Sequence, residues 1–188
     1  MNNQPAGERF RLYSARQLEV VIEQMARQAA ALFDSRREVA LVGILRRGEP
    51  LAQRLQSALM ECCGLPRWPL YPLHLKRYAD DLSLLHADTA LIENPELAAL
   101  DLARTSLLVV DDVLYEGHSL LRASAWLAQM GAMETRTAVL VDRCVNRQPV
   151  RADITGLRLQ VAPTDIIECN VPPYEEEFCI EVLRRALN

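Results

Sequence analysis

Apolar residues recur along the chain at two spacings, and each spacing predicts a different element. Behind Ser14 and Gln17, which form a capping box, apolar residues return every three or four positions, which predicts a long amphipathic helix that ends near Asp34. Continuous apolar runs rich in β-branched residues predict buried strands instead. Four strands are expected, over residues 39–45, 105–114, 135–143 and 152–161.

Helical spacing returns between and after the predicted strands. We expect three further helices, over residues 51–63, 119–131 and 173–188. Gly64 and Pro66 stop the first of these, and Gly131 closes the second. The third has acidic residues in its first turn and arginines in its last turn, as the helix dipole favours.

Strands that alternate with helices indicate an α/β fold with a mostly parallel central sheet flanked by helices. The length of 188 residues suits one hydrophobic core, so we expect a single domain over 1–188. Residues 68–78 alternate and contain two prolines, which favours an irregular edge strand. Residues 79–104 carry mixed signals, and we expect about residues 65–104 to form a small hood with a flexible loop.

Polar residues stand where three of the predicted strands end. Ligands of parallel α/β folds bind at the carboxyl ends of the strands, so the loops that follow these strands are the candidate site. The three loops begin with Arg46, Arg47 and Gly48; with Asp111 and Asp112; and with Asp142 and Arg143.

The stretch LLVVDDVLYEGHSLLRA (107–123) carries the clearest chemical signal. Asp111 and Asp112 end an apolar strand, and buried carboxylates are costly unless a cation or hydroxyl groups meet them. Gly117 then leads to a helix N-terminus at Ser119, where backbone N–H groups and the helix dipole favour an anion. Carboxylates beside an anion site suit a ribose 5-phosphate. The alternative is that the two aspartates cap a neighbouring helix.

Composition and charge exclude other classes of protein. The formal net charge of −4 gives no general attraction for nucleic acid. No apolar run approaches the ~18 residues of a membrane span, and the polar residues 1–11 lack the apolar stretch of a signal peptide. Five cysteines without a CxxC pair indicate reduced thiols and a cytoplasmic location, and the histidines and cysteines show no spacing typical of a metal site.

The quoted stretch is similar to the phosphoribosyl-pyrophosphate (PRPP) motif of the type I phosphoribosyltransferases. VALVGILRRGEPLAQRL (39–55) resembles the pyrophosphate loop of that family, and RYADDLS (77–83) and AVLVDRCVNRQPVRADITG (138–156) follow in the family's order. The ordered set, over about residues 14–160, resembles the PyrR group, the bifunctional pyrimidine-operon attenuators and uracil phosphoribosyltransferases. Residues 166–188 do not match that group.

The resemblance implies a role for each residue of the candidate site. The ribose hydroxyls are expected to contact Asp111 and Asp112, directly or through Mg²⁺, and the 5-phosphate is expected to contact Glu116, Gly117, His118 and Ser119. The pyrophosphate is expected to contact Arg46, Arg47 and Gly48, through a strained non-proline peptide, and also Arg77 on a mobile loop. The base is expected to lie near Asp142 and Arg143. Asp111, Asp112 and Arg77 are the implied catalytic residues, and the two aspartates are the implied metal ligands.

The implied reaction transfers ribose 5-phosphate from PRPP to a nucleobase, with uracil favoured, and releases pyrophosphate. Mg²⁺ is implied because it bridges phosphate and hydroxyl oxygens, and the family also implies a homodimer or higher assembly. Two alternatives stay open: a nucleotide- or RNA-binding regulator without turnover, and an enzyme that uses a different base. RNA would need a basic face, and a loose group of arginines near the first helix is the only candidate: Arg11, Arg16, Arg27, Arg36 and Arg37.

Several positions depart from the family's pattern. Glu116 stands where the phosphate loop usually has threonine. Its charge, ~5 Å from the phosphate at an effective dielectric of ~20, would repel the ligand by about 3 kcal/mol unless Glu116 points away or is protonated. His118 replaces an arginine, and Cys144 and Val145 replace glycine and histidine near the base. Tyr115 stands where many relatives have an acidic residue, so we assign it no role as a general base.

Overall fold

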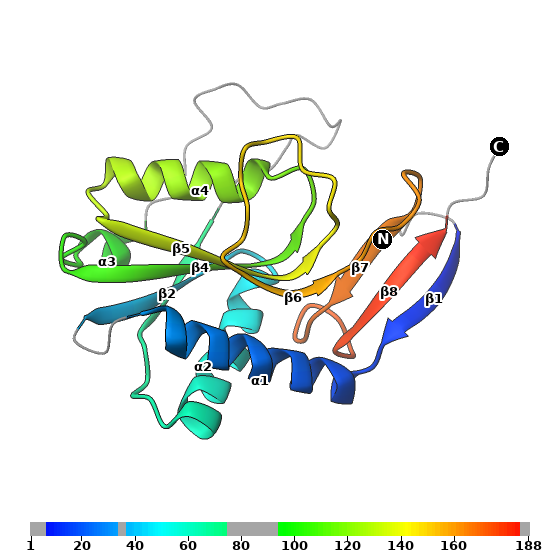
Figure 1. Ribbon diagram of the computed structural model, residues 1–188, viewed down its shortest axis with the longest axis horizontal. Helices are drawn as coiled ribbons and strands as arrows, with labels where there is room; N and C mark the ends of the chain where they lie inside the picture. The colour runs from blue at the N-terminus through cyan, green and yellow to red at the C-terminus, as the bar shows by residue number, and fades with distance from the viewer. Residues whose placement is uncertain (1–6, 34–36, 75–93, 185–188) are drawn as a thin grey trace.

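The computed structural model describes residues 7–33, 37–74 and 94–184, and its strands form two sheets (Figure 1). The strands are β1 Glu8–Tyr13, β2 Glu38–Ile44, β3 Leu70–Leu73, β4 Thr105–Leu114, β5 Glu134–Asp142, β6 Ile154–Arg158, β7 Ile166–Asn170 and β8 Cys179–Arg184. The helices are α1 Ala15–Leu32, α2 Gly48–Cys63, α3 Pro95–Ala98 and α4 His118–Gln129. The five-stranded sheet is parallel, in the order β3-β2-β4-β5-β6, and the three-stranded sheet is antiparallel, in the order β1-β8-β7.

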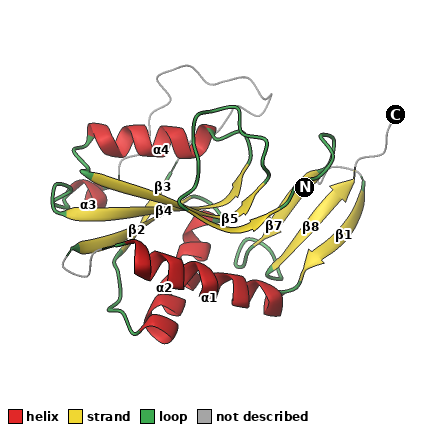
Figure 2. Cartoon of the chain, in the orientation of Figure 1, coloured by secondary structure: helices red, strands yellow, loops and turns green. Residues whose placement is uncertain are grey.

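Helices cover both faces of the parallel sheet, as Figure 2 shows: α1 and α2 lie on one face and α4 lies on the other. Successive side chains of β4 alternate between the two faces, because side chains of a strand point in opposite directions. Leu108 and Val110 belong to the core under α1 and α2, whereas Leu107 and Val109 belong to the core under α4. All four are fully buried, which explains why this strand is a continuous apolar run rather than an alternating one.

The α/β fold with a parallel sheet flanked by helices is therefore confirmed. The predicted edge strand within 68–78 is also confirmed, since β3 ends the sheet beside β2. Of the expected hood, residues 75–93 lie outside the described part of the chain, and residues 94–104 include the short helix α3. The assignment of the whole chain to one domain stays a prediction.

The helix predicted over 173–188 is wrong, because this segment contains strand β8. β8 pairs on both sides: Val182 lies opposite Phe10 of β1 and Ile167 of β7. The acidic residues that favoured a helix start lie in a loop, and Arg184 ends a strand. Strands β1 and β7 were not predicted. Both pair with β8, which lies far from β1 in the sequence and which the sequence pattern had assigned to a helix.

The three-stranded sheet stands beyond the carboxyl ends of the central strands (Figure 1). The Sγ of Cys169 in β7 lies 4.0 Å from the carbonyl oxygen of Asp112 at the end of β4. The second sheet therefore borders the edge of the fold at which ligands of parallel α/β proteins bind. In the part of the chain that the structure describes, no helix is both long and apolar enough to cross a membrane.

Candidate functional site

Asp111 and Asp112 lie at the carboxyl end of β4 and are 2% and 5% exposed. Each carboxylate accepts a hydrogen bond from the next backbone amide: Oδ1 of Asp111 from Asp112 N at 3.0 Å, and Oδ1 of Asp112 from Val113 N at 2.9 Å. The second oxygen of Asp112 lies 3.8 Å from Nη1 of Arg47. The Asp112 carboxylate therefore meets a strand amide and an arginine side chain, which differs from the helix-capping alternative.

The loop between β2 and α2 brings Arg47 beside this pair. The peptide between Leu45 and Arg46 is cis, which agrees with the unusual non-proline peptide that the resemblance implies. A Cβ atom at Gly48 would overlap the carbonyl oxygen of Val110, so the start of α2 can approach β4 this closely only with glycine there. This close packing keeps Arg47 within reach of the aspartate pair.

Arg47 is an ion pair partner of two carboxylates. Its Nε and Nη2 donate to Oε1 of Glu175 at 3.0 and 2.5 Å, and its Nη1 faces Asp112. Burial alone would lower the pKa of Arg47, but the hydrogen bond to Glu175 and the charge of Asp112 outweigh it and raise the pKa. Arg47 is therefore a firmly charged group at the candidate site.

Residues 115–120 form one wall of a pocket of about 160 Å³ that Asp111, Val113 and Leu114 complete. Gly117 has φ +91°, which favours glycine, and α4 begins at the next residue, His118. A Cβ on Gly117 would also lie 3.2 Å from the Cβ of Gln148. The predicted anion loop, with Ser119 in the first turn of α4, therefore lines a pocket that also contains one of the two aspartates.

Glu116 lines this pocket and is an ion pair partner rather than an isolated charge. Its Oε1 lies 3.3 Å from Nη1 of Arg147, and its Oε2 lies 3.4 Å from Nε2 of His118. The backbone of Glu116 accepts hydrogen bonds from the amides of Arg147 and Gln148, both at 3.1 Å. The charge that the sequence analysis expected to repel a phosphate is thus partly balanced by Arg147, a residue that sequence reasoning missed.

Asp142 and Arg143 lie where β5 ends, and Arg143 is only 4% exposed. The Arg143 guanidinium stacks over the ring of Tyr115 at 4.7 Å, and its Nη2 donates to the carbonyl oxygen of Ala162 at 3.3 Å. Oδ1 of Asp142 accepts a hydrogen bond from the amide of Cys144 at 2.8 Å. The loop after β5 is therefore tied to the loop after β4 through Tyr115, so the structure brings the predicted base loop to the same edge.

The C-terminal segment contributes contacts that the sequence analysis did not anticipate. Tyr174 lies under the guanidinium of Arg46 at 5.1 Å, and Glu175 binds Arg47. These residues are 128 positions from their partners, so no local pattern could have revealed the contacts. Arg77, the remaining predicted site residue, lies outside the described residues.

The arginines near α1 give little support for an RNA-binding face. Arg11 pairs with Glu177, and Arg37 lies 3.6 Å from Glu134. Arg36 lies outside the described residues. Two of the arginines that could bind RNA phosphates are therefore already engaged by carboxylates.

Comparison with known proteins agrees with this geometry. The model of the phosphoribosyl transferase domain family matches residues 11–177, which include both sheets up to the start of β8. The chain belongs to the phosphoribosyltransferase family. The match extends to residue 177, so the phosphoribosyltransferase domain includes the first part of the segment 166–188, which the sequence alone did not relate to PyrR.

Curated relatives of this phosphoribosyltransferase are bifunctional PyrR proteins, which confirms the resemblance. The protein from Actinobacillus pleuropneumoniae serotype 5b is 30% identical over 165 residues, covering 87% of this chain and 90% of the relative. The protein from Deinococcus radiodurans is 34% identical over 145 residues, covering 77% and 78%. Among solved structures, hypoxanthine phosphoribosyltransferase of Trypanosoma cruzi aligns with a TM-score of 0.71 at 16% identity, covering 94% and 97%, and supports the fold alone.

Proposed function

We propose that this phosphoribosyltransferase transfers the 5-phosphoribosyl group from PRPP to a nucleobase, with uracil as the favoured acceptor. The observation that carries the proposal is the pocket of about 160 Å³ that joins Asp111 to the loop 115–120. A ribose 5-phosphate needs hydrogen-bond acceptors for its hydroxyls and amide donors for its phosphate, and this pocket offers both in one place.

The proposed roles follow from the positions of the described side chains and, for Arg77, from the family resemblance alone. Asp111 and Asp112 bind the ribose hydroxyls, the amides at residues 117–119 and the hydroxyl of Ser119 bind the 5-phosphate, and Arg46, Arg47 and the close-packed Gly48 bind the pyrophosphate. Asp142 and Arg143 lie near the base, and Arg77 closes over the pyrophosphate. Glu116 and His118 border the phosphate, and Arg147 offsets the charge of Glu116.

Adjacent carboxylates suit Mg²⁺, since this ion prefers oxygen ligands and is often bound through one or two carboxylates and substrate phosphates. Asp111 and Asp112 provide such oxygens at the carboxyl end of β4. When bound, Mg²⁺ would neutralise phosphate charge on PRPP. We therefore propose Mg²⁺ as the cofactor and these two residues as its ligands.

In the proposed reaction, the bond between the anomeric carbon and the pyrophosphate oxygen breaks, and a bond from a base nitrogen to that carbon forms. The nitrogen loses its proton to the leaving pyrophosphate. The sugar passes through a state with positive charge on the ring. Arg46 and Arg47 stabilise the leaving pyrophosphate, and the aspartate pair faces the sugar. Catalysis then depends mainly on positioning and electrostatic stabilisation, which fits a site where Tyr115 supplies no strong base.

The direct test is incubation of the protein with uracil, PRPP and Mg²⁺, followed by chromatographic detection of uridine monophosphate. Other common bases, assayed in parallel, identify the acceptor. This comparison is needed because Cys144 and Val145 replace the family's glycine and histidine near the base. Formation of a nucleoside monophosphate from any base supports the transfer reaction. Folded protein that turns over none of them, and that fails to bind PRPP in calorimetry, would contradict it.

A second activity is suggested by the word "bifunctional" in the names of the curated relatives. For this chain we propose RNA binding only as the alternative, because Arg11 and Arg37 are paired with glutamates. A gel-shift assay with a pyrimidine-operon leader RNA at increasing salt tests it. The homodimer and the cytoplasmic location also stay predictions, and light scattering of the purified protein checks the first.

A further inference from the structure

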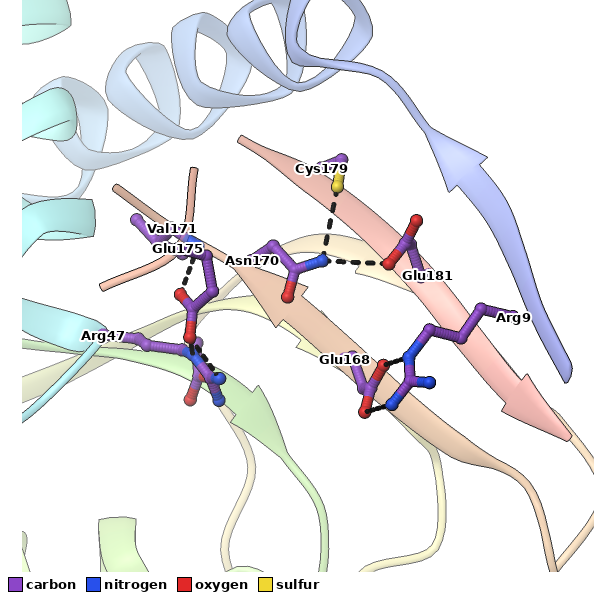
Figure 3. Close-up of polar contacts among 9 residues, drawn as sticks. Arg9, Arg47, Glu168, Asn170, Val171, Glu175, Cys179 and Glu181 are labelled. Atoms are coloured by element: carbon purple, nitrogen blue, oxygen red, sulfur yellow. Dashed lines mark hydrogen bonds and ion pairs between the residues drawn. The ribbon is translucent and has the colours of Figure 1, made fainter. Parts of the chain in front are cut away.

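The connection between β7 and β8 contacts both arginines of the proposed pyrophosphate loop. Tyr174 stacks against Arg46, and Glu175 binds Arg47 through two hydrogen bonds to one carboxylate oxygen. Figure 3 shows Arg47 reaching from the start of α2 to Glu175 in this connection. Two adjacent residues of the C-terminal segment thus contact two adjacent residues of the proposed pyrophosphate loop.

Glu175 is itself fixed at both of its oxygens. Oε1 accepts from Nε and Nη2 of Arg47, and Oε2 accepts from the backbone amide of Val171 at 2.9 Å (Figure 3). Burial opposes ionisation of Glu175, but the hydrogen bonds from Arg47 and from Val171 outweigh it and lower the pKa of the carboxyl group. The carboxylate therefore stays charged at neutral pH and anchors Arg47 to the connection.

The way Glu175 is bound decides which part of Arg47 stays available. A guanidinium has five N–H groups in a rigid plane, and Glu175 takes the edge formed by Nε and Nη2. Nη1 lies at the other edge of the plane, 3.8 Å from Oδ2 of Asp112. One edge of the plane is thus held, and the other is presented beside the aspartate pair.

We propose that Glu175 is a positioning residue for the transfer reaction, holding Arg47 so that its Nη1 side, beside Asp112, meets the pyrophosphate group of PRPP. The inference rests on the proposed function, and it gives a role to the segment 166–188, which did not match the PyrR group in the sequence. An arginine fixed before the ligand arrives loses less side-chain entropy on binding. Glu175 therefore strengthens binding of ligands that carry a diphosphate, and it does not affect a ligand that carries only the 5-phosphate.

Charge alone predicts the opposite sign. Removing a carboxylate near an anion site makes the site more positive and should tighten anion binding. A loss of PRPP affinity in a variant without Glu175 therefore reports lost positioning rather than a changed field. The charge effect and the positioning effect therefore change the affinity for PRPP in opposite directions.

The test is calorimetric titration of PRPP with Mg²⁺, and separately of ribose 5-phosphate, into the wild type, Glu175→Ala, Arg47→Ala and the double variant. We expect Glu175→Ala to weaken PRPP binding about fivefold, the cost of ordering one long side chain. In the Arg47→Ala background the same change should cause no loss of PRPP affinity, because Glu175 acts through Arg47. Ribose 5-phosphate should bind the wild type and Glu175→Ala equally.

Glu176→Ala is the matched control, since it removes an exposed charge from the same connection and the described residues show no ion pair for it. Its PRPP affinity should equal that of the wild type. If Glu175→Ala does not fold, Glu175→Gln, which keeps the length and one acceptor oxygen, replaces it in the cycle and should show a smaller loss in the same direction.

Two results would overturn the inference while leaving the proposed function intact. One is PRPP binding by Glu175→Ala that is as tight as in the wild type, or tighter. The other is an equal loss in the presence and absence of Arg47, which would indicate that Glu175 only closes the loop through Val171. A wild type that binds neither PRPP nor ribose 5-phosphate would instead refute the proposed function itself.

Discussion

Replacing Glu116 by threonine changes the charge at the rim of the proposed phosphate pocket with little effect on the fold. Glu116 borders this pocket, and its carboxylate lies 3.3 Å from Arg147, whose side chain is 76% exposed. Exposed ion pairs of this kind contribute about 0.5 kcal/mol to stability. Glu116→Thr should therefore unfold at nearly the same temperature as the wild type.

The effect on the ligand is larger, because the two charges lie at different distances from the phosphate. At ~5 Å and an effective dielectric of ~20, Glu116 repels a unit negative charge by about 3 kcal/mol. Arg147 lies 3.3 Å from Glu116; taken at ~8 Å from the phosphate, in a more aqueous dielectric of ~40, it attracts the same charge by about 1 kcal/mol. The remaining penalty of about 2 kcal/mol corresponds to a roughly 30-fold loss of affinity, which the threonine variant should recover.

Isothermal titration of ribose 5-phosphate into the wild type and Glu116→Thr measures this difference directly. Glu116→Gln, which removes the charge but keeps the side-chain size, should recover most of the affinity, and Arg147→Ala should weaken binding further. Equal affinity of the wild type and Glu116→Thr would refute the reasoning, because it would mean that Arg147 and His118 neutralise Glu116 completely or that no phosphate binds there.

Three further changes have defined outcomes. Asp112→Asn should lower kcat/KM for PRPP on the order of a hundredfold, about 2.7 kcal/mol of transition-state stabilisation, with an unchanged circular-dichroism melt because asparagine can still accept the hydrogen bond at Oδ1. Gly117→Ala should cost about 1–2 kcal/mol in urea denaturation, since φ is +91° and the new Cβ would lie 3.2 Å from that of Gln148. The hydrogen bond from Ser106 lowers the pKa of Glu134 below its ordinary value of 4.5, so this pair stabilises the fold fully above about pH 4.5 and less as the pH falls below it. Ser106→Ala should therefore reduce the loss of urea resistance between about pH 5 and about pH 3.

The central sheet could be predicted from the sequence because its signals are local. The apolar run 107–110 is buried on both faces of a parallel sheet, and such burial requires apolar residues at every position. The three-stranded sheet could not be predicted, because β1 and β8 pair across most of the chain. The charge pattern of residues 173–188 also fitted a helix dipole, and only the pairing with β1 and β7 decides against it.

Some features of the candidate site also follow from local sequence, whereas others depend on contacts between distant segments. Asp111, Gly117 and Ser119 line one pocket because the strand, the glycine turn and the helix start are consecutive in the chain. The contacts of Glu116 with Arg147 and of Arg47 with Glu175 join different loops. Their energies depend on distances that no sequence spacing encodes.

The central position of β8 in the small sheet has a consequence for synthesis on the ribosome. Strands β1 and β7 each hydrogen-bond to β8, whereas no pairing joins them to one another. The parallel sheet can assemble while the chain is still growing, but the N-terminal strand must wait until residues 179–184 leave the exit tunnel. A nascent chain therefore exposes an unpaired strand edge until β8 has emerged, and such edges promote aggregation.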